Sequence, residues 1–211
     1  YSKITHACCS MLFVAFCISG CTKTELDPVE DCSRIVHDTL GSDLVSILDF
    51  PGITRNDMID DAVAIQQIVD SVQPGTNIFF PAGKYIFSYP VSITTKNIDL
   101  SGEPGTVFVF DNKIDHYAKY NTRVGMLNIG ADDSDISRIT FDQFFSGSGR
   151  MDGDKPRIAC VLIGTYINDN SVSRILVRNI SVVDCVFRDY YGDGLSVFHS
   201  RAVNLSIRRN L

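Results

Sequence analysis

Residues 60–73 place apolar side chains at the spacing of an amphipathic helix. The apolar positions recur every three or four residues, so they share one face of the helix. These positions are Ala62, Ile65, Ile68, Val69 and Val72. Asp60 and Asp61 come first, where carboxylates cap free backbone N–H groups and meet the positive end of the helix dipole. Pro74-Gly75 then ends the helix. The pattern predicts a short helix that covers an apolar surface.

The chain that follows this helix has a different pattern, that of many short strands. Gly, Asn, Asp and Ser separate runs in which apolar and polar residues alternate, as they do in half-buried strands. The clearest runs are 78–80, 107–110, 126–129, 136–141, 180–187, 195–198 and 203–207.

Some of these runs repeat. Arg178-Asn-Ile-Ser-Val returns 23 residues later as Arg201-Ala-Val-Asn-Leu, and Ile136-Ser-Arg-Ile returns as Val172-Ser-Arg-Ile. A β-rich period of roughly 20–25 residues is typical of parallel β-helix coils, and we predict about four or five of them. The helix would then cover the first coil, whose open strand edges would otherwise template aggregation. The pattern is still running at 203–211, so we expect a piece of a longer protein.

Three motifs in the first half of the chain carry a family resemblance. They are Val45-Ser-Ile-Leu-Asp-Phe, Asp60-Asp-Ala-Val-Ala-Ile-Gln and Ile78-Phe-Phe-Pro-Ala-Gly-Lys-Tyr-Ile. In this order they resemble the N-terminal cap of the pectate-lyase-like superfamily, which includes family 28 glycoside hydrolases, rhamnogalacturonases and polysaccharide lyases. The family's usual Gly-rich run is replaced here by residues 51–59. The resemblance covers about residues 45–211 and implies an all-β, right-handed parallel β-helix with an N-terminal capping α-helix.

The N-terminus has the pattern of an export signal. An apolar run over 7–18, too short to span a bilayer, leads into Ile18-Ser-Gly-Cys21. This sequence resembles the bacterial lipobox and implies lipidation of Cys21 and attachment to the membrane. An ordinary cleaved signal is the alternative. We predict a signal peptide over 1–20, a polar tether over 21–44 and the β-helix domain over 45–211, in a lipoprotein of the outer membrane or cell surface.

Composition narrows the choice of partners. The 211 residues are 45% apolar and carry a net charge of −6, which suits one folded domain and gives no reason to expect nucleic acid as a partner. Residues 171–211 nevertheless hold six Arg and three Asp. Guanidinium groups match carboxylates, so this end suits carboxylated sugars. Cys160 and Cys185 are predicted as stacked core residues, and no Cys spacing indicates zinc.

The best candidate for chemistry lies in residues 184–201. Asp193 stands between two glycines before a strand, and Asp-Gly-Leu-Ser-Val resembles the Asn-Thr-Asp-Gly-Ile-Asp segment of family 28 glycoside hydrolases. The resemblance implies that Asp193 is a catalytic carboxylate. Asp189 is the nearby acid that would join it, and His199 and Arg201 are further catalytic candidates. Hydrolysis needs two carboxyl groups, one on each side of the glycosidic bond.

A lyase would use the same region differently. Arg188 or Arg201 would remove the proton next to a uronate carboxylate, and Asp184 and Asp189 would hold Ca²⁺; hydrolysis calls for no metal or other cofactor. Arg188 would bind substrate carboxylates, and aromatic rings would stack on sugars, namely those of Tyr190 and Tyr191. We predict hydrolysis of a pectin-like or other uronate-containing polysaccharide. Lyase action and a non-catalytic glycan-binding adhesin remain alternatives.

Overall fold

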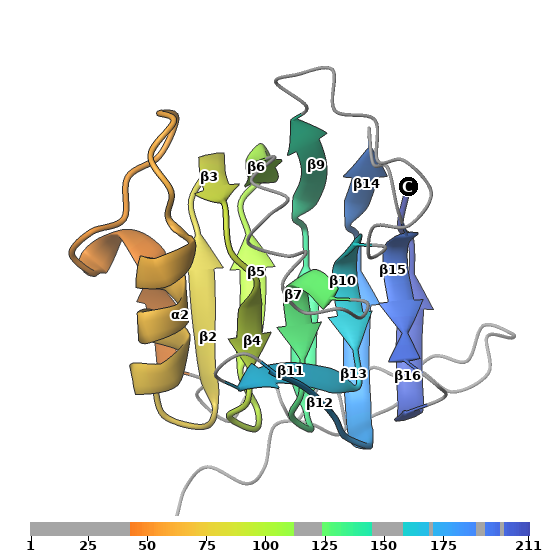
Figure 1. The fold of residues 1–211 in the computed structure, drawn as a ribbon. Coiled ribbons are helices and arrows are strands. Elements are labelled where there is room, and N and C mark those ends of the chain that lie inside the picture. The colour runs from red at the N-terminus through yellow and green to blue at the C-terminus, as the bar shows by residue number, and fades with distance from the viewer. Residues whose placement is uncertain (1–42, 112–123, 145–157, 169–170, 189–192, 199–200) are drawn as a thin grey trace, which may run out of the picture. The chain divides into compact units, whose positions relative to one another are not determined.

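The computed structural model describes residues 43–111, 124–144, 158–168, 171–188, 193–198 and 201–211. The chain passes in turn through three parallel sheets, here named A, B and C, and each coil contributes one strand to each sheet. Figure 1 shows the strands side by side, with helix α2 (Ala62–Ser71) at the first coil. The predicted all-β parallel β-helix with an N-terminal capping helix is therefore confirmed.

The strands fall into these sheets and one separate ribbon. Sheet A has the order β1 (Asp43–Ser46), β2 (Thr76–Phe80), β5 (Asp99–Gly102), β8 (Ser134–Ser137), β13 (Val177–Val183) and β16 (Ala202–Arg208). Sheet B contains β3 (Gly83–Phe87), β6 (Thr106–Asp111), β9 (Thr140–Phe144) and β14 (Val186–Arg188). Sheet C contains β4 (Val91–Ile93), β7 (Val124–Ile129), β10 (Ile158–Ile163) and β15 (Asp193–Val197). Strands β11 (Thr165–Asn168) and β12 (Ser171–Arg174) form an antiparallel ribbon, and a short 3-10 turn spans Ile47–Asp49.

The coils differ in length. Equivalent positions of sheet A are Asn77, Asp99, Asp135, Ser181 and Ser206, so successive coils contain 22, 36, 46 and 25 residues. Only the first and last of these lengths fit the predicted period. The two longer coils contain the long connections 112–123 and 145–157, and the longest also contains the β11–β12 ribbon.

Both predicted repeats were misaligned. Arg178 pairs with Val203, not with Arg201, so the true offset is 25 residues. A shift of two residues leaves every side chain on the same face of a strand, and the apolar pattern therefore cannot detect it. Ile136 pairs with Val182, whereas Val172 belongs to the antiparallel ribbon.

A column of left-handed residues fixes the turn before each sheet A strand. The turn residues of four coils have φ between 55° and 62°, and the first coil has a glycine with φ of 94°. Asn and Asp tolerate this conformation better than other side chains do. Asn204 donates to Asn179 at 3.0 Å and Asn179 donates to Asp133 at 2.7 Å, which links successive coils. The column consists of Gly75, Asn97, Asp133, Asn179 and Asn204.

The core inside the coils is built from stacked side chains. On sheet B, Tyr85, Phe108, Phe141 and Phe187 stand in register, with neighbouring ring centroids 5.1–6.1 Å apart. Cys160 and Cys185 are reduced, buried thiols, as predicted. They do not stack on each other, because Cys160 lies in β10 and Cys185 lies between β13 and β14. Burial raises the pKa of the Cys185 thiol to about 11.

Helix α2 buries the predicted stripe. Ala62, Ile65, Ile68 and Val69 are buried, and Val72 is partly buried against the same core. The helix begins two residues later and ends two residues earlier than predicted. It also covers the edge of sheet C, because the Gln66 side chain exchanges two hydrogen bonds with the backbone of Ser92 in β4, at 2.7 and 3.0 Å.

The predicted capping role of Asp61 is wrong. Asp61 makes no side-chain bond to the helix; its buried carboxylate accepts from Thr54 N at 3.1 Å and from Ile86 N at 2.9 Å. Asp60 does accept from Ala62 N at 3.2 Å, but also from Ser88 N at 2.8 Å. The two aspartates thus bind the open edge of β3, which is the exposed-edge hazard of any sheet.

The buried Asp61 predicts a pH dependence of stability. Burial, with a smaller contribution from Asp57 and Asp60, raises its pKa from 3.8 to about 6. Between these values the folded protein binds more protons than the unfolded chain, so the free energy of unfolding should fall as pH rises toward 6. Denaturant unfolding below and above pH 6 measures this fall. The variant Asp61→Asn should lack that component, and equal pH slopes in the two proteins would contradict the assignment.

Candidate functional site

A line of polar residues follows the corner at which the chain passes from sheet B to sheet C. It contains one position from each coil in turn, Ser88, Asp111, Asp142 and Arg188, together with Asp193 at the start of β15. The connections 112–123 and 145–157 leave the solenoid at this corner. Because long loops on a rigid scaffold carry much of protein function, this corner is the candidate site.

Asp111 and Asp142 lie on the outer face of sheet B. Both are half-buried and alternate with the buried Phe110 and Phe141. Val109 is the register partner of Asp142, so the two aspartates are diagonal neighbours on adjacent strands. Strand spacing and rise place their Cα atoms about 8 Å apart. Two carboxyl groups about 6.5–9.5 Å apart is the arrangement of inverting glycosidases.

Both aspartates have partners in neighbouring coils. Arg188 is the register partner of Asp142, and its Nε and Nη2 both donate to Asp142 Oδ2 at 3.0 Å. This exposed ion pair uses one carboxylate oxygen, so the guanidinium keeps further N–H groups for another acceptor. Ser88 Oγ donates to Asp111 Oδ2 at 3.2 Å.

Asp193 and Arg188 stand at the two ends of one connection, 189–192. Asp193 is half-buried and pairs in register with Ala159 of β10. The following Gly194 is required by packing, since a Cβ there would lie 3.0 Å from Phe187 Cβ and Cγ. The structure thus brings together two of the residues chosen from the sequence.

The remaining predicted residues are placed elsewhere or lie outside the described chain. Arg201 precedes β16, beyond the far end of β15. The five residues of β15 rise about 13 Å, so Arg201 and Asp193 mark opposite ends of sheet C. The other predictions fall outside the described residues: Cys21, Asp189, Tyr190, Tyr191 and His199.

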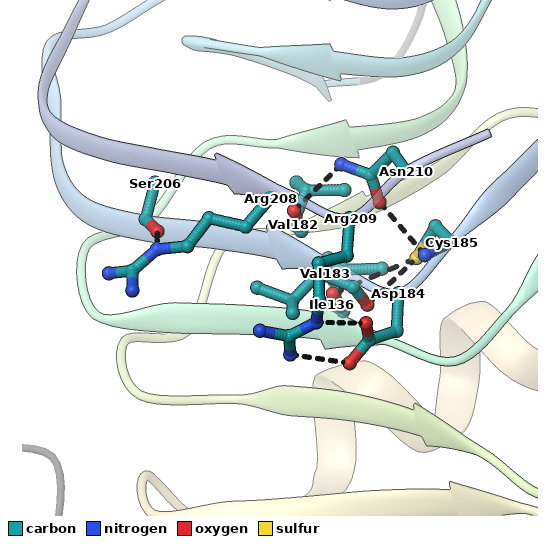
Figure 2. Close-up of polar contacts among 9 residues, drawn as sticks. All are labelled: Ile136, Val182, Val183, Asp184, Cys185, Ser206, Arg208, Arg209 and Asn210. Carbon is teal, nitrogen blue, oxygen red and sulfur yellow. Dashed lines mark hydrogen bonds and ion pairs between the residues drawn. The ribbon is translucent and has the colours of Figure 1, made fainter.

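Asp184 lies away from this corner, at the turn between sheets A and B. Figure 2 shows its carboxylate paired with both Nε and Nη2 of Arg209 in the next coil. This hydrogen-bonded pair raises the pKa of Arg209. Beside it, Asn210 accepts from Cys185 N at 2.8 Å and donates to Val182 O at 2.9 Å. Asp184 is thus part of an inter-coil contact.

Sequence reasoning missed Asp111 and Asp142. Each follows a buried phenylalanine near the end of a strand, which is a usable signal. Their alignment, however, spans a coil of 36 residues and emerges only from the register. Among the described residues no group of three or more His, Cys, Asp or Glu is placed to hold a metal. None of the described helices has the length and apolarity to cross a membrane.

Comparison with known proteins agrees with this architecture. Residues 44–121 match the family model "Rhamnogalacturonase A/epimerase, pectate lyase-like". A search of curated proteins found no match. Three solved structures are weakly similar. The ORF18 protein of Geobacillus virus E2 is 19% identical, with a TM-score of 0.38, over 82% of this chain and 31% of its own.

The second solved structure is the family GH82 iota-carrageenase of A. fortis, which is 14% identical with a TM-score of 0.42 over 78% of this chain and 39% of its own. The third, from Parabacteroides merdae ATCC 43184, is provisionally assigned as a glycosyl hydrolase. It is 12% identical with a TM-score of 0.40, over 80% of this chain and 95% of its own. The chain thus spans about a third of the length of the first two. The family match over residues 44–121 confirms the resemblance read from the sequence, and the parallel β-helix that this pectate-lyase-like segment opens continues through the described residues to Leu211.

Proposed function

We propose that this chain is the polysaccharide-binding and catalytic β-helix of an exported enzyme that hydrolyses uronate-containing glycans. The observation that carries the proposal is the line Asp111, Asp142, Arg188 and Asp193 at the B–C corner of a pectate-lyase-like fold. Carboxyl groups from different coils would act as acid and base on either side of the glycosidic bond. Lipidation of Cys21 would hold the enzyme at the outer membrane or cell surface.

The contacts of Arg188 favour hydrolysis over the lyase alternative. A lyase base must accept a proton, whereas Arg188 donates two hydrogen bonds to Asp142 and carries its charge there. A guanidinium in this arrangement suits the binding of a substrate carboxylate. Asp193, across the 189–192 connection, is the carboxyl group placed to act beside the sugar that Arg188 holds.

The test is product analysis with the full-length protein. It is incubated with polygalacturonate, rhamnogalacturonan, a sulfated galactan and a neutral galactan. Hydrolysis releases new reducing ends without absorbance from unsaturated sugars, and this is the expected result. Unsaturated uronates would identify a lyase. Retention of a glycan without any cleavage would identify a binding module and contradict the proposed enzyme.

A further inference from the structure

The β11–β12 ribbon is an insertion that lies against earlier coils. It leaves the solenoid after Gly164 and returns at Ile175, whose N–H donates to Gly164 O at 2.9 Å. Figure 1 shows both strands running across the direction of the solenoid strands. Ile167 N donates to Ser92 Oγ in β4 at 3.0 Å, two coils away. The ribbon therefore has a fixed position over sheet C.

Two glycines make room for this arrangement. A Cβ on Gly130, just after β7, would lie 2.6 Å from Tyr166 Cβ. A Cβ on Gly164 would lie 2.7 Å from Arg201 Cβ. Tyr166 is half-buried and Arg201 is exposed. The close approaches fix the backbone of both residues at the end of sheet C opposite to Asp193.

Arg174 connects the ribbon to the last coil of sheet C. Its guanidinium carbon lies 4.5 Å from the centroid of the Phe198 ring. Stacking on a ring fixes the guanidinium plane and leaves its N–H groups, which point outward in that plane, available to an acceptor. The same ring edge and face are the kind of surface on which sugars stack.

Arg174 and Arg201 differ from the other arginines of the C-terminal coils. Arg178, Arg188 and Arg209 each pair with an aspartate of a neighbouring coil. Within the described ranges no carboxylate is paired with Arg174 or Arg201. Asp169, at the turn of the ribbon, is the one acid in the sequence 164–176 and lies outside the described residues.

We infer that Tyr166, Arg174, Phe198 and Arg201 form a second binding site, here called the ribbon subsite, for an anionic group on a polysaccharide. The inference rests on the proposed function and adds a site at the other end of sheet C. The about 13 Å rise of β15 separates this site from Asp193, a distance that a few sugar units span. Carboxylate and sulfate share the required chemistry, because both present oxygens to a guanidinium.

The experiment measures dissociation constants of the full-length protein by affinity electrophoresis in polygalacturonate, a sulfated galactan and a neutral galactan. Arg174→Gln should raise the Kd for the anionic polymer at least about tenfold, the effect of losing a charge-assisted contact. Binding of the neutral galactan should not change. Arg208→Gln is the matched control, since Arg208 is equally exposed and donates to Ser206 rather than to an acid. The polymer that responds identifies the anion as uronate or sulfate.

A second variant keeps the test decisive if Arg174→Gln is unstable. Arg174→Lys retains the charge but lacks the planar fork, so an intermediate Kd is expected. An unchanged Kd in both Arg174 variants would overturn the ribbon subsite while leaving the proposed function intact if the wild type still cleaves the polymer. A wild type that neither binds nor cleaves any polymer would overturn both.

Discussion

Replacing Ile65 with Asp is expected to abolish cooperative folding of the β-helix. Ile65 is 1% exposed and belongs to the core that α2 shares with the first coil. The change removes a buried apolar side chain and places a carboxylate where nothing pairs with it. The expected loss is about 4 kcal/mol or more, a large part of the stability of an ordinary domain. Soluble yield and thermal unfolding measure the effect.

Val63→Asp is the matched control for that variant. Val63 lies on the same helix but is 53% exposed, so the same substitution there leaves the core intact. It should stay within about 0.5 kcal/mol of wild type, as surface substitutions usually do. A soluble, cooperatively folding Ile65→Asp protein would show that α2 is not needed to close the first coil.

Replacing Asp193 or Asp142 with Asn should cost about 100-fold to 10,000-fold in the rate of glycan hydrolysis. A positioned carboxyl group contributes this much as a general acid or base, and an amide cannot transfer the proton. Asp142→Asn also removes the charge that holds Arg188 at 3.0 Å, so weaker substrate binding is expected in addition. Initial rates of reducing-end release, with thermal unfolding as a check on folding, measure both effects.

Asp184→Asn is the control for charge and position. Asp184 also pairs with an arginine of the neighbouring coil, and its φ of 57° is one that Asn adopts readily. It lies at the A–B turn, away from the candidate site, so hydrolysis should continue at the wild-type rate. A loss as large as that of Asp193→Asn would mean that the B–C corner is not the centre of the chemistry.

The coil architecture could be predicted because two patterns in the chain have only one structural solution. The three- and four-residue spacing around Ile65 requires a helix with one buried face, and alternating runs such as 107–110 require strands. The buried stripe of α2 and the strand at Phe108 follow directly. Cys160 and Cys185 were identified as core residues for the same reason, their apolar surroundings.

The register, the edge contacts and most of the site could not be predicted in this way. A strand pattern is identical for parallel and antiparallel pairing, so Val172 was placed in a coil although it belongs to the ribbon. An aspartate before a helix can cap the helix or bind a strand edge, and Asp61 does the second. Asp111 and Asp142 approach each other only because coils of unequal length align, and coil length is set by inserted connections.

The central claim, that the B–C corner is where a polysaccharide binds and is cleaved, is tested most directly by a crystal structure of the full-length Asp193→Asn variant with an oligogalacturonate. The account predicts sugar density along the corner, with a uronate carboxylate bound by Arg188 and a glycosidic oxygen between the side chains at 142 and 193. An oligosaccharide bound only on the outer face of sheet A, with the corner empty, would contradict it.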